Sequence, residues 1–189
     1  MARMGLKLML WAPIQTETAT AIPTYDNAKM ITVGKMVSLN VAINNAEGEL
    51  YADDALTEYA GEFSSADLDA ETDNISLENQ AKIYGATYSE QDGFSAKADD
   101  TAPYGGVSGY QVLQIAGVRT FRGWHYAKAK AIMPDLEGNT KGDNISFGTQ
   151  PVKMKITSPS YGPWYRAKDF TDEAEAKAWC EKMLGKTGG

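Results

Sequence analysis

Residues 49–85, ELYADDALTEYAGEFSSADLDAETDNISLENQAKIYG, contain the alternating pattern that decides the fold class. Residues 49–52 predict a strand, an acidic turn follows, and residues 55–71 predict a long second strand. Residues 77–84 predict a short helix, which Gly85 ends. The stretch therefore predicts a β-rich protein with a short internal helix.

Alternation within the second strand separates aromatic from charged side chains. Successive side chains of a strand point to opposite faces, so Tyr59 and Phe63 can be buried while Glu58 and Glu62 face water. The run contains no recognisable nucleophile–base arrangement and no phosphate-binding loop. It is typical of a structural scaffold.

Similar strands are predicted on both sides of this stretch. Residues 5–12 predict a strand that Pro13 ends, and residues 34–43 predict a half-buried strand before a turn at residues 44–48. Together with residues 49–52, the strand at 34–43 is a hairpin candidate.

The second half of the chain continues the β pattern. Asp92 and Gly93 predict the tip of a short hairpin. Residues 108–120 and 122–133 predict two antiparallel neighbours around Gly123. Further strands are predicted at residues 144–158 and 164–168.

The clearest helix covers residues 170–184. Asp172 is a natural N-cap with Glu175 three residues later, and Gly185 ends the helix. Its buried stripe is Ala176, Trp179, Cys180 and Met183. These elements predict one mainly β domain over residues 1–189, a β-sandwich or barrel-like antiparallel core with the internal and C-terminal helices packed on it.

Two segments lie outside this pattern. Residues 14–31 predict a long flexible loop without helical or strand periodicity, and residues 186–189 predict a loose tail. Residues 1–15 begin basic and then turn apolar like a signal peptide. Lys7 interrupts the apolar part and no clean cleavage site follows, so this segment is interpreted as the first strand.

Charge and cysteine content narrow the class of protein. The formal net charge of −7 argues against a protein that grips nucleic acid through its phosphates. The single cysteine, Cys180, excludes an intrachain disulfide. No apolar run approaches the roughly 20 residues that cross a bilayer. We therefore expect a protein made in a reducing cytoplasm, with no membrane partner.

Three groups of residues invite a chemical interpretation. A run of acids resembles a calcium loop: Asp67, Asp69, Glu71 and Asp73, with Glu78 further on. Thr72 stands where the turn needs glycine, and no helix evidently precedes the run, so a solvated acidic face is favoured. His125 and Cys180 lack partners for a metal site or a nucleophile, and core positions are favoured for both. We expect no catalytic residues, no metal, no cofactor and no enzymatic activity.

Aromatic and basic residues leave alternatives open. Tyr161, Trp164 and Tyr165 near Phe170 fit either a glycan or peptide patch or a cover over the core where the last helix docks, and the cover is favoured. Strand lysines can form solvated faces, prevent wrong edge pairing, or pair with acids of a neighbouring subunit. They are Lys128, Lys130, Lys153 and Lys155.

The order of several pieces carries a family resemblance. LYADD at residues 50–54 is followed by the alternating acidic strand, the helix closed by Gly85, the paired strands after Gly105, and the closing WYRAKDF…EAEAKAWCEKMLG. This order resembles the major tail protein (tail-tube protein) of long-tailed bacteriophages and prophages of Gram-positive bacteria. The chain ends soon after its last helix, so the appended immunoglobulin-like domain of longer relatives is not expected.

The resemblance implies a structural virion protein. Such proteins form hexameric rings that stack into a hollow tube around a tape-measure protein, with tail-tip and terminator proteins as further partners. DNA passes through the lumen without specific binding, and assembly takes place in the host bacterial cytoplasm. Candidate lumen-facing acids are Glu58, Glu62, Asp67, Asp69 and Glu71. Candidate inter-ring contacts, from residues 14–31 and 98–106, are Thr24, Tyr25, Asp26, Asn27, Asp99, Asp100 and Tyr104.

Two other functions remain open at this point. One is a monomeric β-sandwich binding module that uses the aromatics at residues 161–165 for a glycan or peptide. The other is a tube subunit of a contractile injection or secretion device, which shares the ring architecture and differs mainly in its other proteins.

Overall fold

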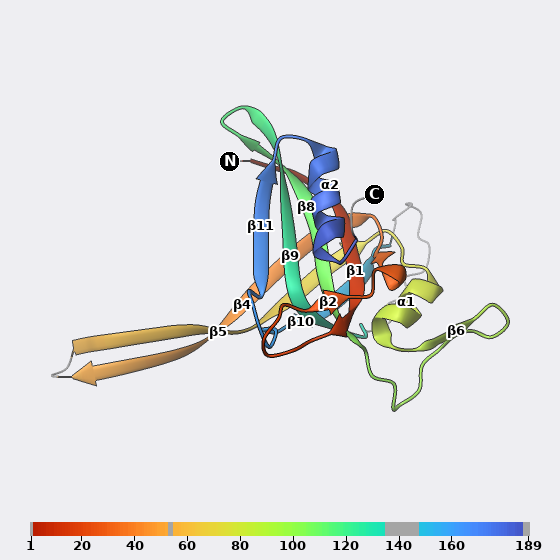
Figure 1. Cartoon of the computed structure of the whole chain (residues 1–189), viewed down its shortest axis with the longest axis horizontal. Coiled ribbons are helices and arrows are strands. Elements are labelled where there is room, and N and C mark those ends of the chain that lie inside the picture. The colour runs from red at the N-terminus through yellow and green to blue at the C-terminus, as the bar shows by residue number, and fades with distance from the viewer. Residues whose placement is uncertain (1, 53–54, 135–147, 187–189) are drawn as a thin grey trace, which may run out of the picture.

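The computed structural model describes residues 2–52, 55–134 and 148–186, and most of them belong to one antiparallel sheet (Figure 1). The strands are β1 (Ala2–Thr16), β2 (Thr24–Tyr25), β3 (Ile31–Thr32), β4 (Met36–Ala52), β5 (Ala55–Thr72), β6 (Thr87–Ser89), β7 (Gly93–Ser95), β8 (Tyr104–Ile115), β9 (Val118–Ile132), β10 (Gln150–Ile156) and β11 (Tyr165–Phe170). The helices are α1 (Leu77–Tyr84), α2 (Glu173–Met183) and a 3₁₀ turn, η1 (Asn27–Lys29).

The sheet folds back on itself into two layers. Its strand order is β2-β1-β8-β9-β10-β5-β4, and one edge of β9 is shared between β11 and β10. In Figure 1, β4 and β5 cross behind a layer that consists of β1, β8, β9 and β11. Helix α2 lies on the outer side of this front layer. The predicted sandwich-like β core with an internal and a C-terminal helix is confirmed.

Strand β9 separates two cores. Trp124 and Tyr126 point between the layers and join the larger cluster, which includes Leu68 of β5 and Met154 of β10. Phe121 points the other way and packs in the cluster beneath α2. Alternation along a strand explains the division, because neighbouring side chains face opposite sides.

Helix α2 begins and docks as its sequence indicates. The Asp172 carboxylate accepts hydrogen bonds from the backbone N–H groups of Ala174 and Glu175, which have no partner inside the helix. Trp179 lies over Gly123 of β9, where a Cβ atom would come within 2.7 Å of the indole. Gly123 is therefore an interior residue of β9, and its missing side chain leaves room for Trp179. The turn between β8 and β9 lies at Ala116 and Gly117 instead.

The predicted turn at residues 44–48 is wrong. Strand β4 runs through it and pairs with β5 along its whole length, so the hairpin tip falls at residues 53–54, outside the described residues. The pairing of β4 with β5 outweighs the local turn propensity of Asn44 and its neighbours. The Asn44 amide donates to the Asp67 carboxylate at 2.7 Å and so takes part in the pairing.

Pro13 does not end β1 either. The strand continues to Thr16, and the Pro13 carbonyl accepts a hydrogen bond from the Asp26 N–H. The N–H that proline lacks would point to this same side, where only the two-residue strand β2 lies. One missing donor is tolerated there because the main pairing of β1 is with β8.

Candidate functional site

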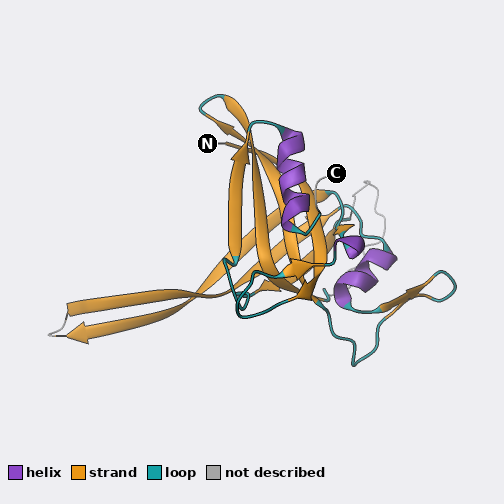
Figure 2. Cartoon of the chain, in the orientation of Figure 1, coloured by secondary structure: helices purple, strands orange, loops and turns teal. Residues whose placement is uncertain are grey.

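A two-stranded arm projects from the sheet. Beyond Phe63, β4 and β5 pair only with each other, and Figure 2 shows them leaving the body as a long ribbon. We call residues 45–62 the arm. Its sequence holds six of the 25 acidic residues and none of the 18 Lys and Arg residues. The arm is therefore strongly acidic.

A β-bulge at the root of the arm decides which way its side chains face. Asn44 lies opposite Ser65 and Asn45 opposite Phe63, which leaves Ser64 as the extra residue. The bulge reverses the alternation, so Glu62 shares the outer face with the three exposed or half-exposed acids of β5 nearer the body. These are Asp67, Asp69 and Glu71. Glu58 lies opposite Leu50 in the register, and its side chain is outside the described residues.

Lysines line the next strand on the same face. Lys153 lies opposite Asp69 and Lys155 opposite Asp67, with 2.8 Å between Lys155 Nζ and the Asp67 carboxylate. Hydrogen bonds from Lys155 and then Asn44 lower the pKa of Asp67, which stays ionised. The outer face therefore carries an acidic row beside a basic row, and Asp69 and Glu71 make no ion pair among the described residues.

The candidate inter-ring residues occupy two separate segments. Thr24, Asn27, Asp99 and Tyr104 are exposed, and Asp26 and Asp100 are half-buried. Tyr104 lies on the outer face of β8, with Lys128 Nζ 4.7 Å and Lys130 Nζ 5.3 Å from its ring centre. Tyr25 differs from the rest because its side chain is buried and its hydroxyl donates to the Ala127 carbonyl at 2.8 Å.

Segment 14–31 is held to the body at several points. The Glu17 carboxylate binds Lys128 Nζ at 2.8 Å and accepts hydrogen bonds from the Ser160 N–H and hydroxyl. Burial raises the pKa of Glu17, and these hydrogen bonds outweigh it so that the pKa is lowered. Strand β2 and the buried Tyr25 fix the next part of the segment.

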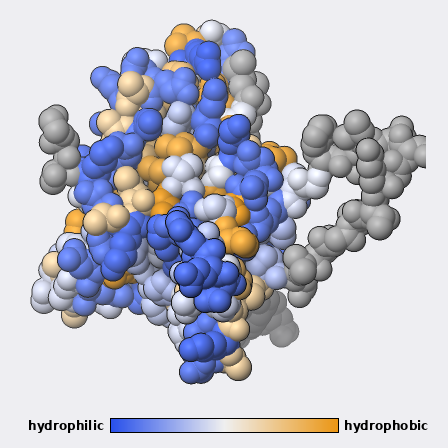
Figure 3. Space-filling view, turned by 90° about the vertical axis from the view of Figure 1, so that its right-hand side faces the viewer, coloured by the Kyte–Doolittle hydropathy of each residue, from blue (hydrophilic) through white to orange (hydrophobic). Residues whose placement is uncertain are grey.

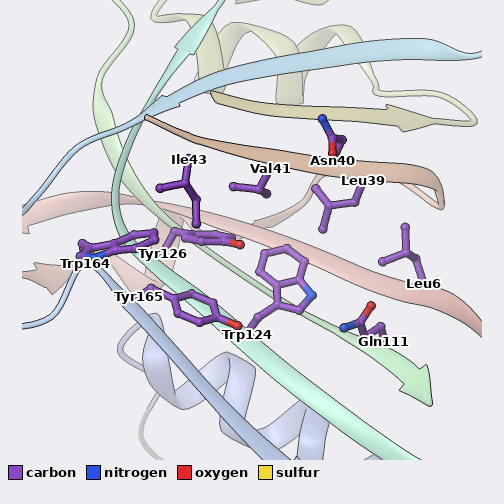
Figure 4. A pocket seen from close by; sticks show the side chains of 10 residues that line it. All are labelled: Leu6, Leu39, Asn40, Val41, Ile43, Gln111, Trp124, Tyr126, Trp164 and Tyr165. Atoms are coloured by element: carbon purple, nitrogen blue, oxygen red, sulfur yellow. The ribbon is translucent and has the colours of Figure 1, made fainter. Parts of the chain in front are cut away.

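An aromatic groove opens between the two layers at the root of the arm (Figure 4). Its volume is about 400 Å³. Leu39, Val41 and Ile43 of β4 form one wall. The opposite side consists of Leu6, Gln111, Trp124, Tyr126, Trp164 and Tyr165. The indole N–H of Trp124 is buried without a hydrogen-bond partner among the described residues.

The aromatics at residues 161–165 divide between core and surface. Trp164 stacks on Phe63 and so covers the core where the arm leaves it. Tyr165 lies in the groove and contacts Tyr126, whereas Tyr161 is exposed and outside the groove. Trp164 does cover the core, as favoured from the sequence. The part that Trp164 covers is the root of the arm rather than the docking site of α2.

A second cavity lies under the C-terminal end of α2, with a volume of about 510 Å³. Arg166 and Lys182 are its cationic residues, and no carboxylate lines it. Sequence patterns do not reveal it, because its lining comes from four separated segments. These are residues 22–25, the middle of β9, residues 163–166 and the end of α2.

His125 and Cys180 are core residues. Burial, followed by the charge of Arg166, lowers the pKa of His125 to about 4, and its ring packs edge-on against Tyr25. The Cys180 thiol donates to the Gly109 carbonyl at 3.2 Å, and burial raises its pKa to about 11. Across the described part of the chain, no three His, Cys, Asp or Glu residues are grouped to hold a metal ion.

The face that carries α1 is mainly hydrophilic, with apolar side chains in separate patches (Figure 3). None of the helices in residues 2–52, 55–134 and 148–186 has the length and apolar character to cross a membrane. No protein-family model and no curated protein sequence matches this chain significantly.

Proposed function

We propose that this protein is a tail-tube subunit whose copies join into hexameric rings, and that the rings stack into the hollow tube of a phage tail. In this role the protein belongs to the virion, and DNA travels through the lumen without specific binding. The order of sequence pieces supports the family, and the arm at residues 45–62 is the structural observation that carries the proposal.

The described part of the chain supplies no third strand and no core for the arm. A single two-stranded hairpin is marginally stable in water, because only one side of each strand is paired and no core covers it. The arm nevertheless extends β4 and β5 far beyond the body (Figure 1). Packing against a second copy would cover this ribbon.

The outer edges of the sheet support the same conclusion. Strand β4 pairs only with β5, and β11 pairs only with β9, so each has one unpaired edge in the described structure. Exposed edges invite pairing with other chains, and closure into a ring removes them. A heterologous contact between different surfaces generates a ring when its rotation closes.

Sedimentation velocity over a concentration series tests the role of the arm. We expect the full chain to form rings or larger particles, and a variant with residues 45–62 replaced by two glycines to remain monomeric. Asn44 and Phe63 lie near each other across the strands, so this variant keeps the body and should unfold cooperatively. Equal assembly by both proteins would remove the arm from the proposal.

The aromatic groove favours one rival. Four aromatic side chains around a 400 Å³ opening suit an extended peptide or a sugar. A protein that stays monomeric at all concentrations, and binds such a ligand saturably with loss on Tyr165→Ala, would replace the tube proposal by a binding module. A tube subunit of a contractile device shares the ring architecture and predicts the same assembly.

A further inference from the structure

The cavity under α2 has positive charge without a matching carboxylate. Arg166 is half-buried, and its described polar contact is from a guanidinium N–H to Met183 Sδ at 3.9 Å. Lys182 is exposed at the same rim. Neither has a carboxylate within ion-pair distance among the described residues. By contrast, Arg122 on the neighbouring strand β9 donates hydrogen bonds from Nε and Nη2 to the two carboxylate oxygens of Asp169.

The rest of the cavity cannot neutralise these cations. His125 lies opposite Arg166 in the sheet register and is neutral at physiological pH. The Tyr25 hydroxyl is occupied by the Ala127 carbonyl. The carbonyl of Lys182 at the end of α2 already accepts from the Gly185 N–H. A carboxylate entering this partly apolar site would meet two cations that have no carboxylate partner among the described residues.

The arm has the complementary charge. It carries six acids and no base, so a second copy that docks it needs a positive surface. Two lysines of the sheet already have partners, since Lys155 binds Asp67 and Lys128 binds Glu17, and Lys130, Lys153 and Lys168 lie outside this cavity. The cavity under α2 combines unpaired cations with a concave opening.

We infer that Arg166 and Lys182 receive a carboxylate side chain from the arm of a second copy of this chain. The inference rests on the proposed self-assembly and names the surface that accepts the arm. Arg166 makes the main contact because its planar guanidinium pairs with both carboxylate oxygens, and Lys182 adds a second charge at the rim.

Charge reversal at both ends tests this pairing. Arg166→Glu is expected to raise the concentration needed for assembly by at least about tenfold, the effect of losing roughly 1.4 kcal/mol per contact. Lys177→Glu is the matched control, since Lys177 lies on α2, is exposed, does not line the cavity and makes no described ion pair. It should assemble like the unmodified protein.

A second substitution that restores assembly identifies the arm residue that pairs with Arg166. Each of the six arm acids is changed to Arg in the Arg166→Glu background, and one of the six reversals should recover assembly. These acids are Glu47, Glu49, Asp53, Asp54, Glu58 and Glu62. Circular dichroism confirms folding, and Arg166→Gln replaces Arg166→Glu if the reversal unfolds the chain. Normal assembly of the Arg166 variants, or recovery by none of the six reversals, overturns the inference. Failure of the unmodified protein to assemble would instead count against the proposed function.

Discussion

Phe63 and Trp164 stack face to face, with ring centroids 3.8 Å apart and an interplanar angle of 7°. Phe63 is the first residue of β5 after the arm, and Trp164 precedes β11. The pair therefore fastens the root of the arm to the opposite layer of the sheet. β5 and β11 do not pair with each other in the sheet, so this contact connects the arm root to the start of a strand that is not its neighbour.

A double-mutant cycle measures this fastening. Phe63→Ala and Trp164→Ala should each lower the free energy of unfolding, and together by about 1 kcal/mol less than their sum, because the stacking energy is lost only once. Urea unfolding supplies the four free energies. Strict additivity would show that the two rings contribute independently.

His125 should make stability depend on acid. Its pKa is about 4 in the folded protein and about 6.5 in an unfolded chain. The unfolded chain therefore binds a proton first as the pH falls, and stability decreases from about pH 6.5 to pH 4 by up to ~1.4 kcal/mol per unit. Urea unfolding of His125→Gln should show a shallower decrease. Carboxylates titrate in both proteins, so identical slopes would exclude His125 as the cause.

Gly123 should not tolerate a side chain. An alanine Cβ would lie 2.7 Å from the Trp179 ring, so Gly123→Ala must displace α2 and should cost about 1–3 kcal/mol. Gly148→Ala is the control, because no atom lies within 4 Å of a Cβ there. Thermal unfolding compares the two variants. Equal stability would mean that Trp179 moves aside freely.

The acidic row of β5 should keep DNA from adhering to the tube wall. Asp69→Lys with Glu71→Lys leaves the Asp67–Lys155 pair intact and makes this face positive. Assembled particles of this variant are expected to retain short DNA at low salt and release it as salt rises, unlike unmodified particles. Glu90→Lys with Glu175→Lys is the control of equal charge change at exposed positions elsewhere. Equal retention of DNA by both variants would indicate that another face of the protein lines the lumen.

Periodicity in the sequence predicts the elements whose partners are local. Asp172 and the Ala176–Cys180 spacing mark α2, and Asp92-Gly93 marks the β6–β7 hairpin, where Gly93 has a φ of +70°. Residues 44–48 mislead because their turn propensity is weaker than the pairing with β5. Gly123 misleads because its role is to admit Trp179, which lies more than fifty residues further along the chain.

Alternation reveals that a strand has two faces but not what covers them. It identifies the acids of β5, whereas the bulge at Ser64, which aligns Glu62 with Asp69, depends on the register with β4. The sequence does not predict that the arm projects from the sheet either, because residues 45–62 alternate as they would in a strand that packs on a core. The cavity at Arg166 forms only when four distant segments meet. Such features depend on tertiary structure.

Negative-stain electron microscopy of the purified protein, over a concentration series, shows whether this protein builds a tube. A tail-tube subunit should form rings with a central hole at moderate concentration and tubes with a regular axial repeat at high concentration. Particles that remain featureless monomers throughout, and that also fail to extend tubes when offered a tail-tip complex and tape-measure protein, would contradict it.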